Sequence, residues 1–385
     1  MLEDAIPALV AGVVLVGCAY YVLVLLAARQ FLRRRRERKT HLGEAPAISV
    51  LKPLAGEEPE LAENLGSFFR LSYPRYEVLC ATRDGDDPAL AIAREVRSNY
   101  PDSDARLLVA GESDCPNAKV HSLAAMTAVA ASELVVISDS DIRADPALLW
   151  ELARDFEDPA VGVVTCPYRA VPGPSLWSRL EALGMNTEFW SGVLVAQFLA
   201  PMKFAVGPTM AVRKSCLDAI GGWDAFGDFL AEDFEVGRQA RRAGYEVRLS
   251  THAVEHRIGS QALRENLVHR LRWRRSTRRS RPVGYWGEIL ANPMPWALLL
   301  PLAASGAAWS WAAVGACVAL RTSAALMVGG RVLGDNLRWW RFWLLPLQDG
   351  LSLLVWYAGL FGRRIVWRGR AYELSRDGRL RPWKA

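Results

Sequence analysis

The sequence predicts an α/β protein whose central domain, residues 45–260, carries a mostly parallel sheet and is flanked by transmembrane helices at both ends of the chain. Two observations predict this architecture. Short β-branched runs alternate with helix-length patterns in the central region, which is typical of βαβ units. Long apolar runs lie towards both ends, while the 385 residues together are 51% hydrophobic and 23% charged. That balance excludes a disordered protein and a protein that lies entirely within a membrane.

The cysteines and the charged residues further limit the classes of protein to which this chain can belong. The six cysteines contain no CxxC pair and have no regular spacing. This argues against a disulfide framework or a structural zinc site, and it favours a reducing compartment. The net charge of +6 arises from 47 Lys and Arg against 41 Asp and Glu, so its uneven placement along the chain matters more than its size.

Residues 1–32 are predicted to form an N-terminal transmembrane anchor. No charged residue occurs between positions 5 and 28, and a helix of that length crosses the ~30 Å hydrocarbon core of a bilayer. A basic cluster at 33–39 follows the apolar run, which reverses the order found in a cleaved signal peptide. Basic flanks favour the cytoplasmic side, so we expect the central domain in the cytoplasm. The alternative is a buried core helix.

The central domain is expected to alternate strands and helices. Strands are predicted over residues 47–51, 76–82, 106–110, 134–138, 161–166 and 246–250. Helices are predicted over residues 58–69, 88–98, 117–130, 146–156 and 233–243. Because ligands bind at the carboxyl ends of strands in such sheets, polar residues that follow a strand are the first candidates for a site.

After residue 260 the chain becomes basic and then apolar. We expect a basic amphipathic segment at the membrane interface (261–290), transmembrane helices (293–362) and a basic cytoplasmic tail (363–385). Residues 296–318 predict one span and residues 342–361 another, in which Asp349 would be functional or buried against a partner helix. Two spans with a re-entrant or surface segment near 322–333, or four short spans, would both leave the tail in the cytoplasm.

The segment ELVVISDSDIR places two carboxylates directly after a hydrophobic strand. Asp139 and Asp141 alternate along an extended segment, so their side chains can converge. Hard oxygen ligands of this kind suit Mg²⁺ or Mn²⁺, which often bridge to a diphosphate. The alternative is a capped turn that leads into the helix near residue 146.

A second acidic group follows the strand 76–82 in the segment ATRDGDDP. Asp87 precedes a proline and fits the N-cap of the next helix. Asp84 lies directly after the strand, and we assign it to a site in which it accepts hydrogen bonds from a uracil ring or a ribose.

A third acidic pair, Glu232-Asp233, opens a predicted helix. The helix dipole stabilises an anion at this position and would keep Asp233 ionised and ready to accept a proton. The alternative is an ordinary helix cap.

The segment HRLRWRRSTRRSRP holds seven arginines and one tryptophan. Arg272 and Trp273 lie just before a predicted span, where an arginine can fork to phosphate oxygens and close a diphosphate site. The alternative is a juxtamembrane patch attracted to anionic lipid. The flanking spans argue against nucleic acid as a partner.

Three further residues are candidates. Lys52 ends the first strand and Lys119 lies in the first turn of a helix, so both can contact phosphate or can be ordinary surface charges. His256 follows the last predicted strand and can serve as a third metal ligand or as a structural histidine.

Together these motifs resemble the membrane-bound family 2/21-type glycosyltransferases, and most closely the ceramide glucosyltransferases. The blocks ISVLKPLAGEEPELAENLGSFF and YPRYEVLCATRDGDDPA are similar to the opening of that family and to its first Asp signature, at Asp84. SDSDIR and LAED, which ends at Asp233, match the second and third signatures. HRLRW matches the terminal (Q/R)xxRW motif with one departure, because His269 stands where Gln or Arg is usual.

The resemblance implies a GT-A fold and an inverting transfer of glucose from UDP-glucose to the primary hydroxyl of ceramide. Asp233 would be the base. Asp139 and Asp141 would hold a divalent metal on the diphosphate, and Asp84 would hold the uridine. His269, Arg272 and Trp273 would close the site near the bilayer of this multi-pass integral membrane protein.

Three alternatives stay open from the sequence. A hopanoid glycosyltransferase would move N-acetylglucosamine from UDP-GlcNAc to a hopanoid polyol. A processive polysaccharide synthase would need more spans to line a channel. A non-enzymatic membrane scaffold or lipid-binding protein would not need the acidic residues, which are all present.

Overall fold

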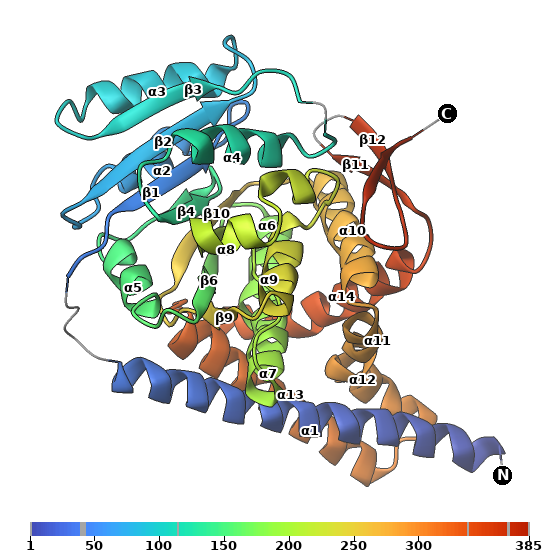
Figure 1. Cartoon of the computed structure of the whole chain (residues 1–385). Coiled ribbons are helices and arrows are strands. Elements are labelled where there is room, and N and C mark those ends of the chain that lie inside the picture. Colours follow the sequence, from blue (N-terminus) through green and yellow to red (C-terminus); the bar gives the residue numbers. More distant parts are fainter. Residues whose placement is uncertain (1, 39–43, 114, 337–338, 368–369, 384–385) are drawn as a thin grey trace. The chain divides into compact units, whose positions relative to one another are not determined.

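The structure is a computed structural model of the chain that describes residues 2–38, 44–113, 115–336, 339–367 and 370–383 (Figure 1). The chain divides into two compact units. The helical unit comprises Met1–Arg36, Pro172–Ala200 and Ser260–Arg363. The sheet unit comprises Glu37–Val171, Pro201–Gly259 and Arg364–Ala385.

A seven-stranded sheet in the order β3-β2-β1-β4-β8-β6-β9 forms the core of the sheet unit. Its strands are β1 (Ile48–Pro53), β2 (Tyr76–Thr82), β3 (Ala105–Val109), β4 (Leu134–Ser138), β6 (Val161–Thr165), β8 (Thr209–Arg213) and β9 (Glu246–Leu249). The pairs β1–β2, β1–β4, β2–β3 and β6–β9 are parallel, which confirms the predicted α/β fold with a mostly parallel sheet. Every residue of β1, β4 and β6 is buried, as expected for strands covered on both faces.

The helices of this unit lie where the sequence pattern places them, with one addition. They are α2 (Leu61–Phe68), α3 (Pro88–Ser98), α4 (Ala118–Val129), α5 (Leu148–Asp155), α8 (Lys214–Ala219) and α9 (Glu232–Arg242). Helix α8 was not predicted. The predicted cap of α3 is confirmed, because the carboxylate of Asp87 accepts a hydrogen bond from the amide of Ala89 at 2.9 Å.

Strand β8 was not predicted either, and it lies antiparallel between β4 and β6. A run of five residues carries too little periodicity to separate a buried strand from a loop. The strand matters for the site because the Pro208 carbonyl, next to its first residue, accepts a hydrogen bond from the amide of Asp139 at 3.0 Å.

Two small sheets complete the unit. One has the order β5-β10-β7, with β5 (Ile142–Arg143), β7 (Tyr168–Pro172) and β10 (Val254–Gly259). The other is antiparallel and consists of β11 (Arg364–Trp367), β12 (Arg370–Leu374) and β13 (Leu380–Pro382). The second sheet shows that the predicted tail is folded: its apolar residues Ile365, Tyr372, Leu374 and Leu380 form a small buried cluster among the arginines.

The helical unit gathers helices from three parts of the chain. They are α1 (Leu2–Glu37), α6 (Leu176–Gly184), α7 (Trp190–Leu199), α10 (Leu263–Ser280), α11 (Pro282–Ala291), α12 (Met294–Ala303), α13 (Ala308–Ala325) and α14 (Leu345–Gly359). Shorter turns are the π-helices η1 (Met185–Phe189) and η3 (Leu326–Val332) and the 3-10 helix η4 (Trp339–Leu344). Among the described residues, the helices long and apolar enough to cross a membrane are Ala5–Glu37 and Ala308–Val332.

The prediction of a continuous span over 296–318 was wrong. Helix α12 ends at Ala303 and α13 begins at Ala308, and between them Ser305 and Gly306 have φ angles of 50° and 78°. Backbone in the left-handed region ends a helix, so the apolar run forms two separate helices, α12 and α13. Residues 322–332, near which a surface or re-entrant segment was one alternative, continue α13 into η3.

Asp349, the charged residue within the predicted span 342–361, is buried against a partner helix. Its Oδ2 accepts from Nε of Arg321 and its Oδ1 from Nη2, both at 2.8 Å, and both side chains are 2% exposed. Arg321 also donates to the hydroxyl of Thr187 at 3.0 Å. This network ties α13, α14 and η1 together in the apolar unit.

Candidate functional site

The candidate site lies at the carboxyl edge of the main sheet. Strands β1, β2 and β4 run parallel and in register, so the residues that follow them emerge at the same edge. Lys52 lies near the end of β1, Asp84 follows β2, and Asp139 and Asp141 follow β4. The sheet therefore brings together candidates that are far apart in sequence.

Lys119 lies at the centre of the acidic groups. Its Nζ is 2.7 Å from Oδ1 of Asp139 and 2.8 Å from Oε1 of Glu232, so it joins the segment after β4 to the start of α9. Burial alone would lower the pKa of Lys119, but Asp139 and Glu232 outweigh it and raise the pKa above its usual range. The ammonium therefore stays charged between the two carboxylates.

Asn117 explains why Lys119 is held in this position. Its side-chain oxygen accepts from the amides of Lys119 and Val120 at 3.1 and 3.3 Å and so caps α4. Its amide nitrogen donates to the carbonyl of Phe229 at 2.9 Å and to Oε2 of Glu232 at 3.2 Å. One buried side chain thus fixes the start of α4 against the segment that leads into α9.

Lys52 lies beneath the acidic segment. Its side chain is fully buried, and its Nζ donates to the backbone carbonyl of Asp139 at 2.5 Å and lies 4.0 Å from the ring centroid of Phe68. Burial lowers the pKa of Lys52 to about 8, and Asp139 opposes this shift. In this structure Lys52 positions the backbone of the acidic segment; its expected phosphate contact stays a prediction.

Asp141 has a different partner from Asp139. Its Oδ2 lies 2.9 Å from Nε2 of His256 on β10. Burial would raise the pKa of Asp141, but the imidazole and its hydrogen bond lower it below the usual range. Oδ1 of Asp141 is buried and has no hydrogen-bond partner, so this carboxylate keeps one oxygen for a cation. In the described part of the chain, no three His, Cys, Asp or Glu side chains form a complete metal cluster.

Asp233 lies in the first turn of α9, next to Glu232. Burial, followed by the negative charge of Glu232, raises the pKa of Asp233 to about 7. A carboxylate with such a pKa can accept a proton near neutral pH.

Glycines make room for Asp233 and for its helix. A Cβ on Gly207 would lie 2.8 Å from Oδ2 of Asp233, and a Cβ on Gly237 would lie 2.4 Å from the amide nitrogen of Ala205. Neither position tolerates a larger side chain without movement, so α9 packs directly on the backbone before β8.

Asp84 is the most open of the acidic candidates. Its side chain is 49% exposed, and its Oδ2 accepts from Nε and Nη2 of Arg83 at 3.1 and 3.0 Å. It shares the sheet edge with the other acids, but its contacts lie outside the Lys119 cluster. The exposed carboxylate is open to a ligand at the end of β2.

The motif residues of the helical unit form a separate network on α10. Nε1 of Trp273 lies 3.0 Å from Nε2 of His269, whose Nδ1 lies 2.7 Å from Oε1 of Glu181 on α6. Since the indole N–H can only donate, Nε2 must accept and Nδ1 must carry the proton donated to Glu181. His269 thus fixes the Trp273 ring. Arg272 lies on the same helix.

Sequence reasoning missed Glu181 and the role of Glu232. Glu181 is 88 residues from His269 along the chain, and no motif marks it. Glu232 stands beside Asp233 in LAED, so its acidic neighbour was the available signal. Both are buried carboxylates that hold a nitrogen-bearing side chain in place.

Comparison with known proteins agrees with these motifs. The model of glycosyl transferase family 21 matches residues 9–380. Ceramide glucosyltransferase 3 of Caenorhabditis elegans is 27% identical over 266 residues, which cover 69% of this chain and 57% of that protein. Ceramide glucosyltransferase 1 of the same organism is 30% identical over 209 residues, 54% of this chain and 44% of that protein. The chain thus spans about half the length of these relatives.

The fold also has a solved counterpart. A mannosyltransferase from Pyrobaculum calidifontis, solved with GDP-Man and Mn²⁺, superposes with a TM-score of 0.54 at 18% identity and covers 92% of this chain and 99% of its own. At this identity the likeness shows the fold alone, an α/β fold of the GT-A glycosyltransferase type. Because the family model spans nearly all of the sequence, the chain belongs to glycosyl transferase family 21, the ceramide glucosyltransferase family.

Proposed function

We propose that this chain is an inverting glycosyltransferase that moves glucose from UDP-glucose to the primary hydroxyl of ceramide at the cytoplasmic face of a membrane. One observation carries the reaction type: Asp233, with a pKa near neutrality, lies at the start of α9 beside the Lys119–Asp139–Glu232 cluster. The names of the C. elegans relatives support the choice of sugar and lipid.

The proposed reaction is a single displacement. The acceptor oxygen forms a bond to the anomeric carbon as the bond from that carbon to UDP breaks, and UDP leaves with the electron pair. Asp233 accepts the proton of the acceptor hydroxyl during the attack. Attack from the face opposite the leaving group inverts the anomeric centre to a β-glucoside.

The leaving diphosphate needs positive charge. Asp139 and Asp141 would hold Mg²⁺ or Mn²⁺, and the unpartnered Oδ1 of Asp141 fits such a cation. When bound, the ion offsets the negative charge that develops on the departing UDP. Lys119 keeps its charge beside Asp139 and orients that carboxylate, while His256 orients Asp141.

Other residues are assigned to substrate binding within this proposal. Asp84 would hold the uridine, and Lys52 and Lys119 would contact phosphate. His269, Arg272 and Trp273 would bind at the membrane end of the substrates, with Arg272 forking to phosphate oxygens. The locked His269–Trp273 pair supports this assignment, because a fixed indole offers a preorganised surface.

We further propose that the chain is a multi-pass integral membrane protein. The candidate spans Ala5–Glu37 and Ala308–Val332 meet at their carboxyl ends, where Arg35 donates to the carbonyls of Arg331 and Val332 at 3.3 and 2.7 Å. The adjacent arginines of α1 favour the cytoplasm for this shared end. Both ends of the chain would then contribute membrane helices. Because the central domain and the tail sheet would both be cytoplasmic, the chain would also have to cross the membrane before Ala308, and the shorter apolar helix Met294–Ala303 would provide that crossing.

The donor and the acceptor are tested together by product analysis. Membranes that contain the full chain are incubated with labelled UDP-glucose or UDP-GlcNAc, each with ceramide or a hopanoid polyol, and lipid products are identified by mass spectrometry. The proposal expects hexosylceramide from UDP-glucose and ceramide. If the main product is an N-acetylglucosaminyl hopanoid, the chain is instead a hopanoid glycosyltransferase. A long polymer would indicate a polysaccharide synthase. No product with any pair of substrates would indicate a scaffold.

A further inference from the structure

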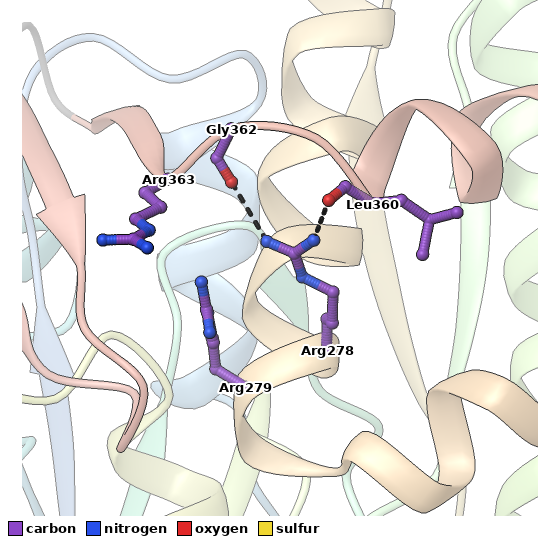
Figure 2. Close-up of a pocket in the computed structure, with 5 residues that line it drawn as sticks. All are labelled: Arg278, Arg279, Leu360, Gly362 and Arg363. Atoms are coloured by element: carbon purple, nitrogen blue, oxygen red, sulfur yellow. Dashed lines mark hydrogen bonds between the residues drawn. The ribbon is translucent and has the colours of Figure 1, made fainter.

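A cavity of about 400 Å³ in the helical unit lies outside the proposed catalytic residues (Figure 2). It is lined by Arg278 and Arg279 at the end of α10 and by Leu360, Gly362 and Arg363 after α14. Three of these five residues are arginines and none of the five is acidic. The lining is therefore strongly cationic.

Hydrogen bonds from α10 hold the loop after α14 that lines this cavity. Nη2 of Arg278 donates to the carbonyl of Gly362 at 3.0 Å, and Nη1 donates to that of Leu360. Nε of Arg275 donates to the carbonyl of Phe361 at 3.1 Å. Three consecutive carbonyls of the loop after α14 are thus held by guanidinium groups, and Figure 2 shows Arg279 rising from α10 towards the same loop.

The loop needs the glycine at its turn. Gly362 has a φ of 79°, and a Cβ there would lie 2.8 Å from Nη2 of Arg275. Arg363 follows this glycine and lines the cavity together with Arg279.

Like charges repel in this cluster. The pKa of Arg275 is lowered by burial and then by the positive charge of Arg278. A bound anion would offset that repulsion, and the planar guanidinium group matches the oxygens of a phosphate in bidentate geometry.

Exposed apolar side chains lie close in sequence to the residues that line the cavity. On α14 and just after it, Leu354, Tyr357 and Phe361 are 68%, 59% and 58% exposed, and the rings of Tyr357 and Phe361 pack 5.3 Å apart. On α11, Val283 and Trp286 are 86% and 57% exposed. Aromatic residues beside arginines are typical of the membrane–water interface. A free phosphate would not need exposed apolar side chains near its site, whereas an acyl chain would cover them.

We propose that this cavity binds the phosphate of an anionic membrane phospholipid through Arg278, Arg279 and Arg363, with the acyl chains against Tyr357 and Phe361. The site is separate from the proposed sugar transfer and does not depend on it.

The test compares lipid retention in the full-length protein. Wild type, the double variant Arg279→Gln/Arg363→Gln and the control Arg94→Gln/Arg97→Gln, which removes two exposed arginines of α3, are reconstituted in nanodiscs of phosphatidylcholine with phosphatidylglycerol. Native mass spectrometry then measures bound lipid. Wild type and control are expected to prefer phosphatidylglycerol, and the double variant is expected to lose that preference by roughly tenfold. Arg278 is left intact because it holds the loop.

Two results would overturn the proposal. One is an unchanged lipid preference in the double variant. The other is full displacement of phosphatidylglycerol by excess inorganic phosphate, which would make the cavity a site for free anions. Unfolding midpoints in pure phosphatidylcholine check the fold; if the double variant unfolds earlier, the single variants Arg279→Gln and Arg363→Gln take its place and each must show a weaker preference than the control.

Discussion

Nζ of Lys119 lies 2.7 Å from Oδ1 of Asp139 and joins the segment after β4 to Glu232 at the start of α9. Lys119→Met should therefore damage both stability and activity, because it leaves the buried Glu232 without its ammonium partner. We expect a loss of about 2–3 kcal/mol in the free energy of unfolding, measured by thermal or denaturant unfolding in detergent. Lys203→Met, at an exposed lysine, is the control and should change neither. Equal stability of the two variants would contradict the structural role.

The pH dependence of transfer should report Asp233. Burial and Glu232 raise its pKa to about 7, and a general base acts only when deprotonated. The turnover rate should therefore rise with pH up to about 7 and then level off. Glu232→Gln removes the neighbouring negative charge, so the pH range over which the turnover rate rises should move to lower values. If the turnover rate of the wild type instead rises around the ordinary carboxyl pKa, and this midpoint does not move in Glu232→Gln, Asp233 is not the base.

Metal affinity should depend on His256, which lies 2.9 Å from Asp141. Removal of a residue that orients a metal ligand typically weakens binding by about tenfold or more. We expect that weakening for Mn²⁺ in His256→Ala, measured by electron paramagnetic resonance without substrate, whereas His252→Ala should bind as wild type does. Asp141→Ala should bind more weakly still. Wild-type affinity in Asp141→Ala would exclude this carboxylate as a ligand.

The His269 position should accept glutamine. A Gln side chain can accept from the indole N–H of Trp273 through its oxygen and donate to Glu181 through its nitrogen, as the histidine does. His269→Gln should therefore keep most of the activity, and His269→Leu should lose at least about tenfold by leaving Glu181 and the indole unpaired. The kcat/KM value for the lipid acceptor is measured for the two variants and for the wild type. Indistinguishable variants would show that the hydrogen bonds are unimportant.

The buried pair of Arg321 and Asp349 should show strong coupling. Each single change to leucine leaves a charge without its partner in the apolar helical unit and should cost about 3 kcal/mol or more. The double variant Arg321→Leu/Asp349→Leu removes both charges and should recover much of that loss. Thermal unfolding of the four proteins forms a double-mutant cycle, and additive losses would mean that the pair contributes nothing as a pair.

The sequence predicted best what depends on local pattern. Asp139, Asp141 and Asp233 were placed correctly at a strand end and a helix start, because apolar runs of four to eight residues and helix periodicity locate such ends. The partners of these acids were harder to predict. Glu232 and Lys119 lie 113 residues apart, and only the order of strands in the sheet brings them into contact.

The misplaced elements have equally specific causes. Strand β8 is a short buried run without alternation, so nothing local distinguishes it. The break between α12 and α13 was hidden by apolar residues on both sides, although Ser305-Gly306 is a turn signal that the sequence contains. The tail forms a sheet because alternate apolar residues, such as Tyr372 and Leu374, lie between its arginines.

The rate of lipid glucosylation in Asp233→Asn tests whether Asp233 is the base of the proposed transfer. The control is Asp228→Asn, five positions earlier, where the carboxylate pairs with Arg379 at the surface. Initial rates at saturating UDP-glucose and ceramide are followed by mass spectrometry, with UDP binding as a check on folding. We expect the rate to fall at least about 100-fold in Asp233→Asn and to stay unchanged in Asp228→Asn, since a positioned general base accelerates a reaction by about that factor. A folded Asp233→Asn protein that transfers glucose at the wild-type rate would contradict it.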